Sequence, residues 1–310
     1  MKPELVVAPK DLGELKVLAE SGADAFIIGS SKLMMCGRGS FEREAVAAAV
    51  KLAHGLGKKV YLTMDAIMPN QLLGEAELYL NEVKHLKFDG VRYGDLGVYL
   101  LLRAIVPQMP LHFVDQMMLT NYKTINYWFK RGVGRVKLAP ELTLDEVIEI
   151  KKEITGEAEI LIHGAQLMFT SRRRLVENYF NFQKRMGQKI EMAPHGNCLW
   201  DAERERYYPI VENTHGTHIF SGNDVCMIDE LQVLIEAGIE AFYLEGFVYE
   251  TKTFVEMVAL YRLALDLAVH DKKRYRQISP AMYAEVEKQQ QGLRPLDRGF
   301  YYKPTIYKNK

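Results

Sequence analysis

Residues 159–179 read EILIHGAQLMFTSRRRLVENY. The apolar run at residues 160–162 is rich in isoleucine, which predicts a β-strand. We expect this strand to end at residues 163–165, so that His163, whose ordinary pKa lies near neutrality, is presented where the strand stops. A basic triplet then leads into a predicted helix. Segments that follow strand ends carry the chemistry of α/β enzymes, so this stretch predicts the position of a functional site.

Short apolar runs of this kind alternate with helical segments along the whole chain. The segments between successive runs are long enough to hold a crossover helix, which predicts that the strands are parallel. The eight predicted strands are residues 5–8, 25–28, 60–63, 90–93, 111–114, 135–138, 160–162 and 241–244.

Eight parallel strands are the number that closes a (β/α)8 barrel, which typically takes ~250 residues. The alternative is an open, doubly wound sheet, which more often has a glycine-rich phosphate turn after its first strand. Residues 8–11 read APKD and contain no such turn. We therefore predict an α/β fold in which residues 1–270 form a TIM-like (β/α)8 barrel.

Two segments lie outside the regular alternation. The long gap before the last strand predicts an insertion after strand 7 at residues 171–224, with a β-hairpin formed by residues 208–211 and 217–220 around Gly216. Residues 271–310 form a C-terminal tail that is basic and aromatic.

The composition is that of an ordinary globular protein. The 310 residues are 48% hydrophobic and 26% charged, with a formal net charge of zero. No overall field favours nucleic acid or a membrane, so such a partner would have to meet a local patch. No apolar run is long enough to span a bilayer, and we expect a cytoplasmic protein with no membrane partner. Three scattered cysteines are too few for a disulfide framework.

A closed barrel gathers the carboxyl ends of its strands on one face. Clustered carboxylates with one histidine suit acid–base catalysis or a cation. The alternative for the aspartates is helix capping, and for the histidine a satisfied structural role. The strand-end residues are Asp65, Asp95, Asp115, Glu141, His163 and Glu245, of which Asp115, Glu141, His163 and Glu245 are the catalytic candidates.

Basic and metal-ligand patterns occur in or beside the insertion. Arg172, Arg173 and Arg174 form a basic patch that suits phosphate or RNA, because arginine presents a fork of donors. The pairs His195–Cys198 and His215–His218 have ligand-like spacings. They lack the regular register of a zinc knuckle, so we predict no metal site there.

Several motifs together resemble the collagenase-like peptidase family U32. The resemblance implies a (β/α) barrel and hydroxylation reactions in which prephenate, not dioxygen, supplies the oxygen. The implied targets are the wobble uridine of tRNA, giving 5-hydroxyuridine, and ubiquinone precursors. It also implies substrate or RNA contacts at Gln116 and Asn121. The motifs are residues 7–9, 22–25, Asp115-Gln116 with Asn121, residues 135–138 with Glu141, 163–165, 212–220, 244–246 and 294–301.

Many members resembling this chain hold an iron–sulfur cluster on four cysteines. Here those four positions carry Leu167, Arg174, Cys198 and Ala202, so Cys198 alone is retained. One thiol cannot hold a cluster that is normally ligated by four thiolates. Two arginines of the family are also replaced, by Pro140 and Phe247.

The resemblance therefore implies a cluster-less member that binds no cofactor of its own. We expect it to support tRNA wobble-uridine hydroxylation beside a cluster-bearing paralogue, as a heterodimer, or else to form a homodimer, with tRNA as a further partner. One alternative is a peptidase or hydrolase that acts through the strand-end carboxylates and His163. Another is a non-catalytic scaffold.

Overall fold

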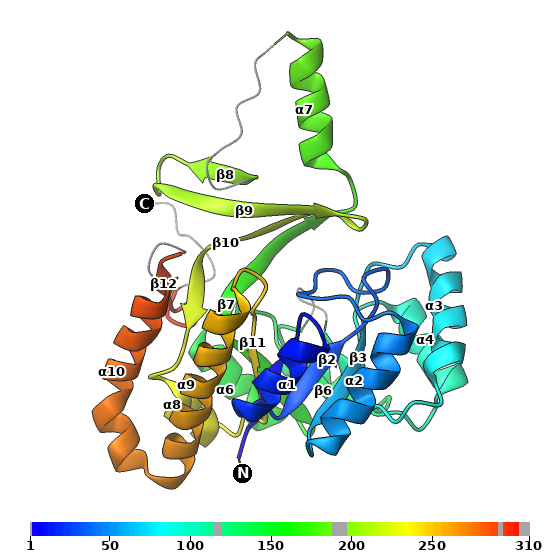
Figure 1. Ribbon diagram of the computed structural model, residues 1–310. Coiled ribbons are helices and arrows are strands. Elements are labelled where there is room, and N and C mark those ends of the chain that lie inside the picture. Colours follow the sequence, from blue (N-terminus) through cyan, green and yellow to red (C-terminus); the bar gives the residue numbers. More distant parts are fainter. Residues whose placement is uncertain (1, 115–118, 188–196, 291–293, 304–310) are drawn as a thin grey trace.

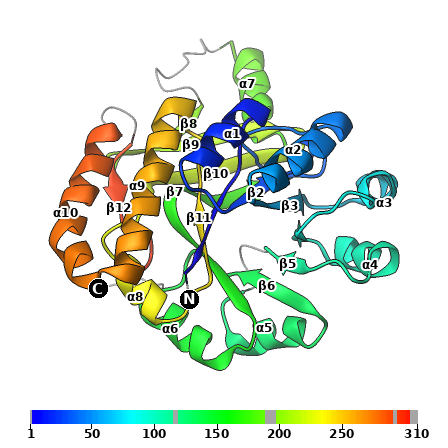
Figure 2. The ribbon, with the colours of Figure 1, turned by 60° about the horizontal axis from the view of Figure 1, so that its bottom comes forward.

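The computed structural model describes residues 2–114, 119–187, 197–290 and 294–303. Its centre is a parallel sheet in which β11 pairs with both β1 and β7, so that the sheet closes into a barrel (Figure 2). This closure confirms the predicted (β/α)8 barrel and excludes the open, doubly wound sheet. The barrel strands among the described residues are β1 (Glu4–Val7), β2 (Ala25–Ile28), β3 (Lys59–Met64), β4 (Gly90–Tyr93), β5 (Leu111–Phe113), β6 (Val133–Lys137), β7 (Glu157–Ser171) and β11 (Ala241–Leu244).

Helices surround the barrel because each turns an apolar face to the strands. Side-chain caps mark the start of some of them: Asp11 caps α1, and Thr143 with Glu146 forms a capping box at α6. The helices between the barrel strands are α1 (Leu12–Glu20), α2 (Arg43–Gly55), α3 (Asn70–Val83), α4 (Leu96–Ile105), α5 (Tyr122–Phe129), α6 (Leu144–Glu153) and α8 (Leu231–Glu236), and α9 (Thr251–His270) follows β11.

The strand β7 is longer than the sequence predicts. The expected end at residues 163–165 is wrong, because the strand continues to Ser171. Its outer half pairs with β10 (Gly216–Cys226), antiparallel, with Cys226 opposite His163 and Thr217 opposite Ser171. β10 thus forms the backbone hydrogen bonds with β7 where β7 extends beyond the barrel.

Above the barrel the chain builds a small antiparallel sheet with a protruding helix (Figure 1). β10 pairs with β9 (Arg206–Asn213), and β9 pairs with β8 (Cys198–Asp201). The hairpin between β9 and β10 turns at residues 214–215. The helix α7 (Leu175–Arg185) follows β7 directly and has no buried residue.

The C-terminal residues pack against the barrel. Residues 272–289, part of the predicted basic and aromatic tail, form the helix α10 (Lys272–Gln289) beside α9, because Tyr275, Met282 and Val286 form a buried face along it. The short strand β12 (Leu296–Asp297) then pairs with β10. Within the described residues, no helix combines the length and apolar character needed to cross a membrane.

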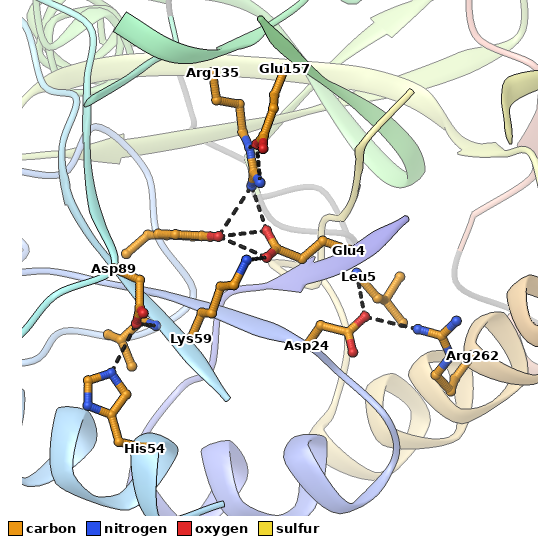
Figure 3. A network of polar contacts seen from close by, with 11 residues as sticks. Glu4, Leu5, Asp24, His54, Lys59, Asp89, Arg135, Glu157 and Arg262 are labelled. Carbon is orange, nitrogen blue, oxygen red and sulfur yellow. Dashed lines mark hydrogen bonds and ion pairs between the residues drawn. The ribbon is translucent and has the colours of Figure 1, made fainter. Parts of the chain in front are cut away.

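The amino ends of the strands carry a network of charges that closes the floor of the barrel (Figure 3). Arg135 donates to Glu4 at 2.6 Å and pairs with Glu157 at 2.6 Å, while Lys59 lies 2.8 Å from Glu4. The Tyr61 hydroxyl donates to the same carboxylate at 2.7 Å. The barrel interior is therefore polar at its floor, where Arg135, Lys59 and Tyr61 all contact the Glu4 carboxylate.

Candidate functional site

A cavity lies at the carboxyl ends of the barrel strands, and we call it the mouth. Its polar lining residues are Asp65 after β3, Lys137 at the end of β6, Gln166 in β7, Tyr243 in β11 and Glu245 just after it, with the Cys36 thiol beside them. The mouth measures about 40 Å³. It shares lining residues with a wider groove of about 490 Å³.

Lys137 supplies the amine of the mouth. Its side chain makes no hydrogen bond or ion pair with any residue the structure describes, and its Nζ lies 4.4 Å from the centre of the Tyr243 ring. Burial lowers the pKa of Lys137, and the charge of Arg92 acts in the same direction. The carboxylates of Glu159, Glu245 and Asp65 oppose this shift.

Tyr243 and Glu245 form a hydrogen-bonded pair in the same cavity. The Tyr243 hydroxyl donates to Glu245 Oε2 at 2.8 Å, and the Phe247 backbone N–H donates to Oε1 at 2.9 Å. Burial raises the pKa of Glu245 above its ordinary value, although these hydrogen bonds and Lys137 partly oppose the shift. A raised pKa favours the protonated form of the carboxyl group, which suits Glu245 to donate a proton.

The Cys36 thiol lines the mouth but is not an activated nucleophile. Burial, together with the charges of Asp65 and Glu245, raises its pKa to about 12. A thiol with so high a pKa stays protonated at neutral pH. Asp65 is held by the backbone N–H of Met35, which donates to its Oδ1 at 3.1 Å.

His163 does not line the mouth. The pairing of β7 with β11 shifts register so that Tyr243 lies opposite Leu161 and Leu244 opposite His163. This irregularity places the imidazole against the Tyr249 and Tyr261 hydroxyls, at 3.0 and 3.2 Å, where it is fully buried. Burial lowers its pKa to about 4, with Asp224 opposing the shift, so the ring is neutral at pH 7.

The other predicted strand-end residues are divided between the groove and helix caps. Glu141 lines the groove and is exposed. Asp95 lines it too, and it caps α4 through a hydrogen bond from the Gly97 N–H at 2.7 Å. Asn121 caps α5 by accepting from the Thr124 N–H at 2.9 Å. The predicted residues Asp115 and Gln116 lie outside the described residues.

The predicted arginine patch lies beside α7, away from the mouth. Arg172, Arg173 and Arg174 are all exposed, and Arg174 pairs with Glu177 at 2.8 Å. Along α7, side chains spaced by one or two turns form an apolar stripe on one face. The stripe consists of Leu175, Tyr179, Phe182 and Met186, which are 39%, 57%, 58% and 61% exposed. This face combines exposed aromatic rings with flanking cations.

The residues present do not fit an iron–sulfur cluster. Of the four positions that the resemblance assigns to thiolates, Leu167 lines the mouth and Arg174 directly precedes α7, while Cys198 lies in β8. Two positions thus present an alkyl group and a guanidinium, neither of which ligates iron. Across the described ranges, no group of three or more histidine, cysteine or acidic side chains is arranged to hold a metal ion.

The histidines of the insertion make other contacts. His215 Nε2 lies 2.9 Å from the Ser31 carbonyl, whereas His218 contacts Asn213 and Thr170 at 3.1 and 3.2 Å. His195, the first residue of the other spaced pair, lies outside the described residues.

Sequence reasoning missed Lys137 and Tyr243. The sequence did contain a signal for Lys137. Charged and apolar residues alternate over residues 135–138, so that Arg135 and Lys137 lie on one face of the strand and Val136 and Leu138 on the other. On a barrel strand such alternation places charges inside. Nothing in the sequence marks Tyr243, because it lies in a run of apolar residues.

Fold and mouth together define a (β/α)8-barrel protein with a polar cavity at the carboxyl ends of its strands. The sequence matches Peptidase family U32 over residues 10–309, and the chain belongs to that family. It is 39% identical over 307 residues to "tRNA hydroxylation protein P2" of Bacillus subtilis (strain 168), with 99% of each chain covered.

Two longer relatives share the same region. "tRNA hydroxylation protein P1" of Bacillus subtilis (strain 168) is 25% identical over 276 residues, which cover 88% of this chain and 65% of that protein. "tRNA hydroxylation protein P" of Escherichia coli (strain K12) is 27% identical over 317 residues, covering 87% of this chain and 69% of that protein. This chain thus spans about two thirds of each longer relative.

Proposed function

We propose that this chain takes part in the hydroxylation of the wobble uridine of tRNA to 5-hydroxyuridine. The observation that carries the proposal is the similarity to a tRNA hydroxylation protein at 39% identity over nearly the full length of both chains. The proposal places the chain in the cytoplasm, where its RNA substrate is found, and takes prephenate as the source of the oxygen.

The surface around α7 supports a contact with RNA. The wobble position belongs to a single-stranded loop, and unpaired bases are recognised by stacking on aromatic rings beside cations. Tyr179 and Phe182 are more than half exposed, and Arg172 and Arg173 follow the end of β7 at the base of the same helix. This arrangement offers rings for bases and guanidinium groups for phosphates.

The chain's cysteines support a division of labour with a second U32 protein. Cys226 is buried with its thiol protonated, since burial raises its pKa to about 11, and Cys36 has a raised pKa as well. The positions expected to bind a cluster hold Leu167, Arg174 and Ala202. In the proposal a paralogue that keeps four cysteines supplies the redox centre. This chain supplies the RNA contacts and the cavity at the carboxyl ends of its barrel strands.

Nucleoside analysis tests the proposal. The gene for this chain is deleted from its host, and bulk tRNA is digested and measured for 5-hydroxyuridine by mass spectrometry. We expect the modified nucleoside to fall and to return when the wild-type chain is expressed. The proposal would be wrong if 5-hydroxyuridine is unchanged in the deletion strain and is still unchanged when the genes for the U32 paralogues are deleted as well. The chain would then have another function. Cleavage of gelatin or short peptides by the purified chain would favour the peptidase alternative.

A further inference from the structure

The amine of Lys137 stands out among the charged groups inside the barrel. Arg92 is paired with Glu159, and Arg135 is paired with Glu4 and Glu157. Lys137 has no such partner among the described residues, and its side chain lines the mouth at the carboxyl end of β6. Groups at this end of a barrel are placed to meet a ligand.

The surroundings of this amine are those of a nucleophile. Burial and the charge of Arg92 lower the pKa of Lys137, which raises the fraction present as the neutral amine. Asp65 and Glu245 line the same cavity, so a positive charge that develops on the nitrogen has carboxylates close to it. An amine must be neutral when it attacks a carbonyl carbon, and it becomes cationic afterwards. The lowered pKa favours the neutral amine, and the nearby carboxylates stabilise the cation.

We propose that the mouth binds a small aldehyde or ketone and that Lys137 Nζ forms an imine with its carbonyl carbon. The nitrogen lone pair forms the C–N bond, and the C=O π pair moves to the oxygen, which takes up the proton that the nitrogen gives up. The resulting carbinolamine takes a second proton from the Glu245 carboxyl group and loses its oxygen as one water molecule when the nitrogen lone pair forms the C=N bond. No electron acceptor or donor is required, and the products are a protonated imine and water.

The Tyr243–Glu245 pair supplies the proton transfers. The hydroxyl and the carboxyl group are joined by the 2.8 Å hydrogen bond, and both line the cavity together with Lys137. Because burial raises the pKa of Glu245, this group can give a proton to the departing oxygen and take one back from the nitrogen. Tyr243 holds the carboxyl group in place through the hydrogen bond.

The space available limits the ligand. The mouth, with a volume of about 40 Å³, has room for a carbonyl group. The adjoining groove of about 490 Å³ falls within the range of small-molecule sites and can hold the rest of the ligand. The inference rests on the mouth residues alone and is independent of the proposed role in tRNA hydroxylation.

Reductive trapping tests the inference on the full chain. The protein is incubated at pH 7 with sodium cyanoborohydride and either pyruvate or dihydroxyacetone, then digested and mapped by mass spectrometry. We expect a reduced adduct on Lys137 that saturates with probe concentration. It should form about tenfold or more faster than on Lys252, whose side chain is 89% exposed, because the mouth holds the carbonyl group beside the Lys137 amine.

Two variants serve as controls. Lys137→Arg should abolish the saturable adduct and leave the labelling of Lys252 unchanged, and Glu245→Gln should slow labelling at Lys137. The wild-type measurement decides the question without either variant. Labelling of Lys137 by either probe supports the site, and the two probes together show whether a carboxylate on the ligand matters. An unlabelled Lys137, or one labelled no faster than Lys252, would overturn the inference.

Discussion

Arg92 and Glu159 face each other across the inside of the barrel in a bidentate ion pair. The guanidinium nitrogens lie 2.6 and 2.8 Å from the two carboxylate oxygens, and both side chains are almost fully buried. Their strands, β4 and β7, are not neighbours in the sheet. The pair therefore spans the interior below the mouth and fixes the electrostatic environment of Lys137.

Breaking this pair should destabilise the protein strongly. We expect Arg92→Met to lower the free energy of unfolding by about 3 to 5 kcal/mol, because it leaves the Glu159 charge buried without its main partner. The double variant Arg92→Met, Glu159→Met should be less destabilised than the single variant. Urea denaturation measures both. As a control, Arg174→Ala removes an exposed pair and should change stability by no more than about 0.5 kcal/mol.

His163 should give the protein an acid-sensitive component of stability. Its pKa falls from 6.5 to about 4 on folding, so the folded state binds fewer protons than the unfolded state between these values. The free energy of unfolding therefore has its full value above pH 6.5 and decreases by on the order of 3 kcal/mol as the pH falls towards 4. Urea denaturation at several pH values should show a flatter profile in this window for His163→Gln. Equal profiles for the variant and the wild type would contradict the buried, neutral histidine.

Asp224 should hold the C-terminal segment in place. It accepts hydrogen bonds from Tyr249 at 2.7 Å, Gln290 at 2.9 Å and Arg294 at 2.7 Å. We expect Asp224→Asn to weaken these bonds and to leave the Arg294 charge buried without its counter-ion. Limited proteolysis should then release the C-terminal peptide faster than in the wild type. Asp201→Asn, which alters an exposed pair with Arg204, is the matched control.

The exposed stripe on α7 should contribute to tRNA affinity. We expect Tyr179→Ala with Phe182→Ala to weaken tRNA binding by about 1 to 3 kcal/mol per stacked base, and Arg172→Gln to reduce the salt dependence of binding. Folding should be unaffected, because no residue of α7 is buried. Electrophoretic or fluorescence titrations provide the measurement. If tRNA binding is unchanged while association with another subunit is lost, the stripe is a protein interface instead.

The architecture could be predicted because short runs with apolar residues alternate regularly with helical segments along the chain. What the sequence could not show depends on partners distant in the chain. β7 continues past His163 because β10, whose residues lie 46 to 63 positions further along the chain than their partners, pairs with its outer half. The register shift that turns His163 away from the mouth arises from the pairing with β11. The carboxylates Asp65 and Glu245 were predicted at the mouth, whereas Lys137 and Tyr243 were found only when the strands were seen in register.

Reconstituted hydroxylation is the most direct test of the central claim that this chain takes part in tRNA hydroxylation beside a cluster-bearing paralogue. Unmodified tRNA and prephenate are incubated with the purified chain, with its cluster-bearing paralogue, and with both together, and 5-hydroxyuridine is quantified by mass spectrometry. We predict no product from this chain alone and more product from the two proteins together than from the paralogue alone. Full activity of this chain alone, or no gain from adding it to the paralogue, would contradict the claim.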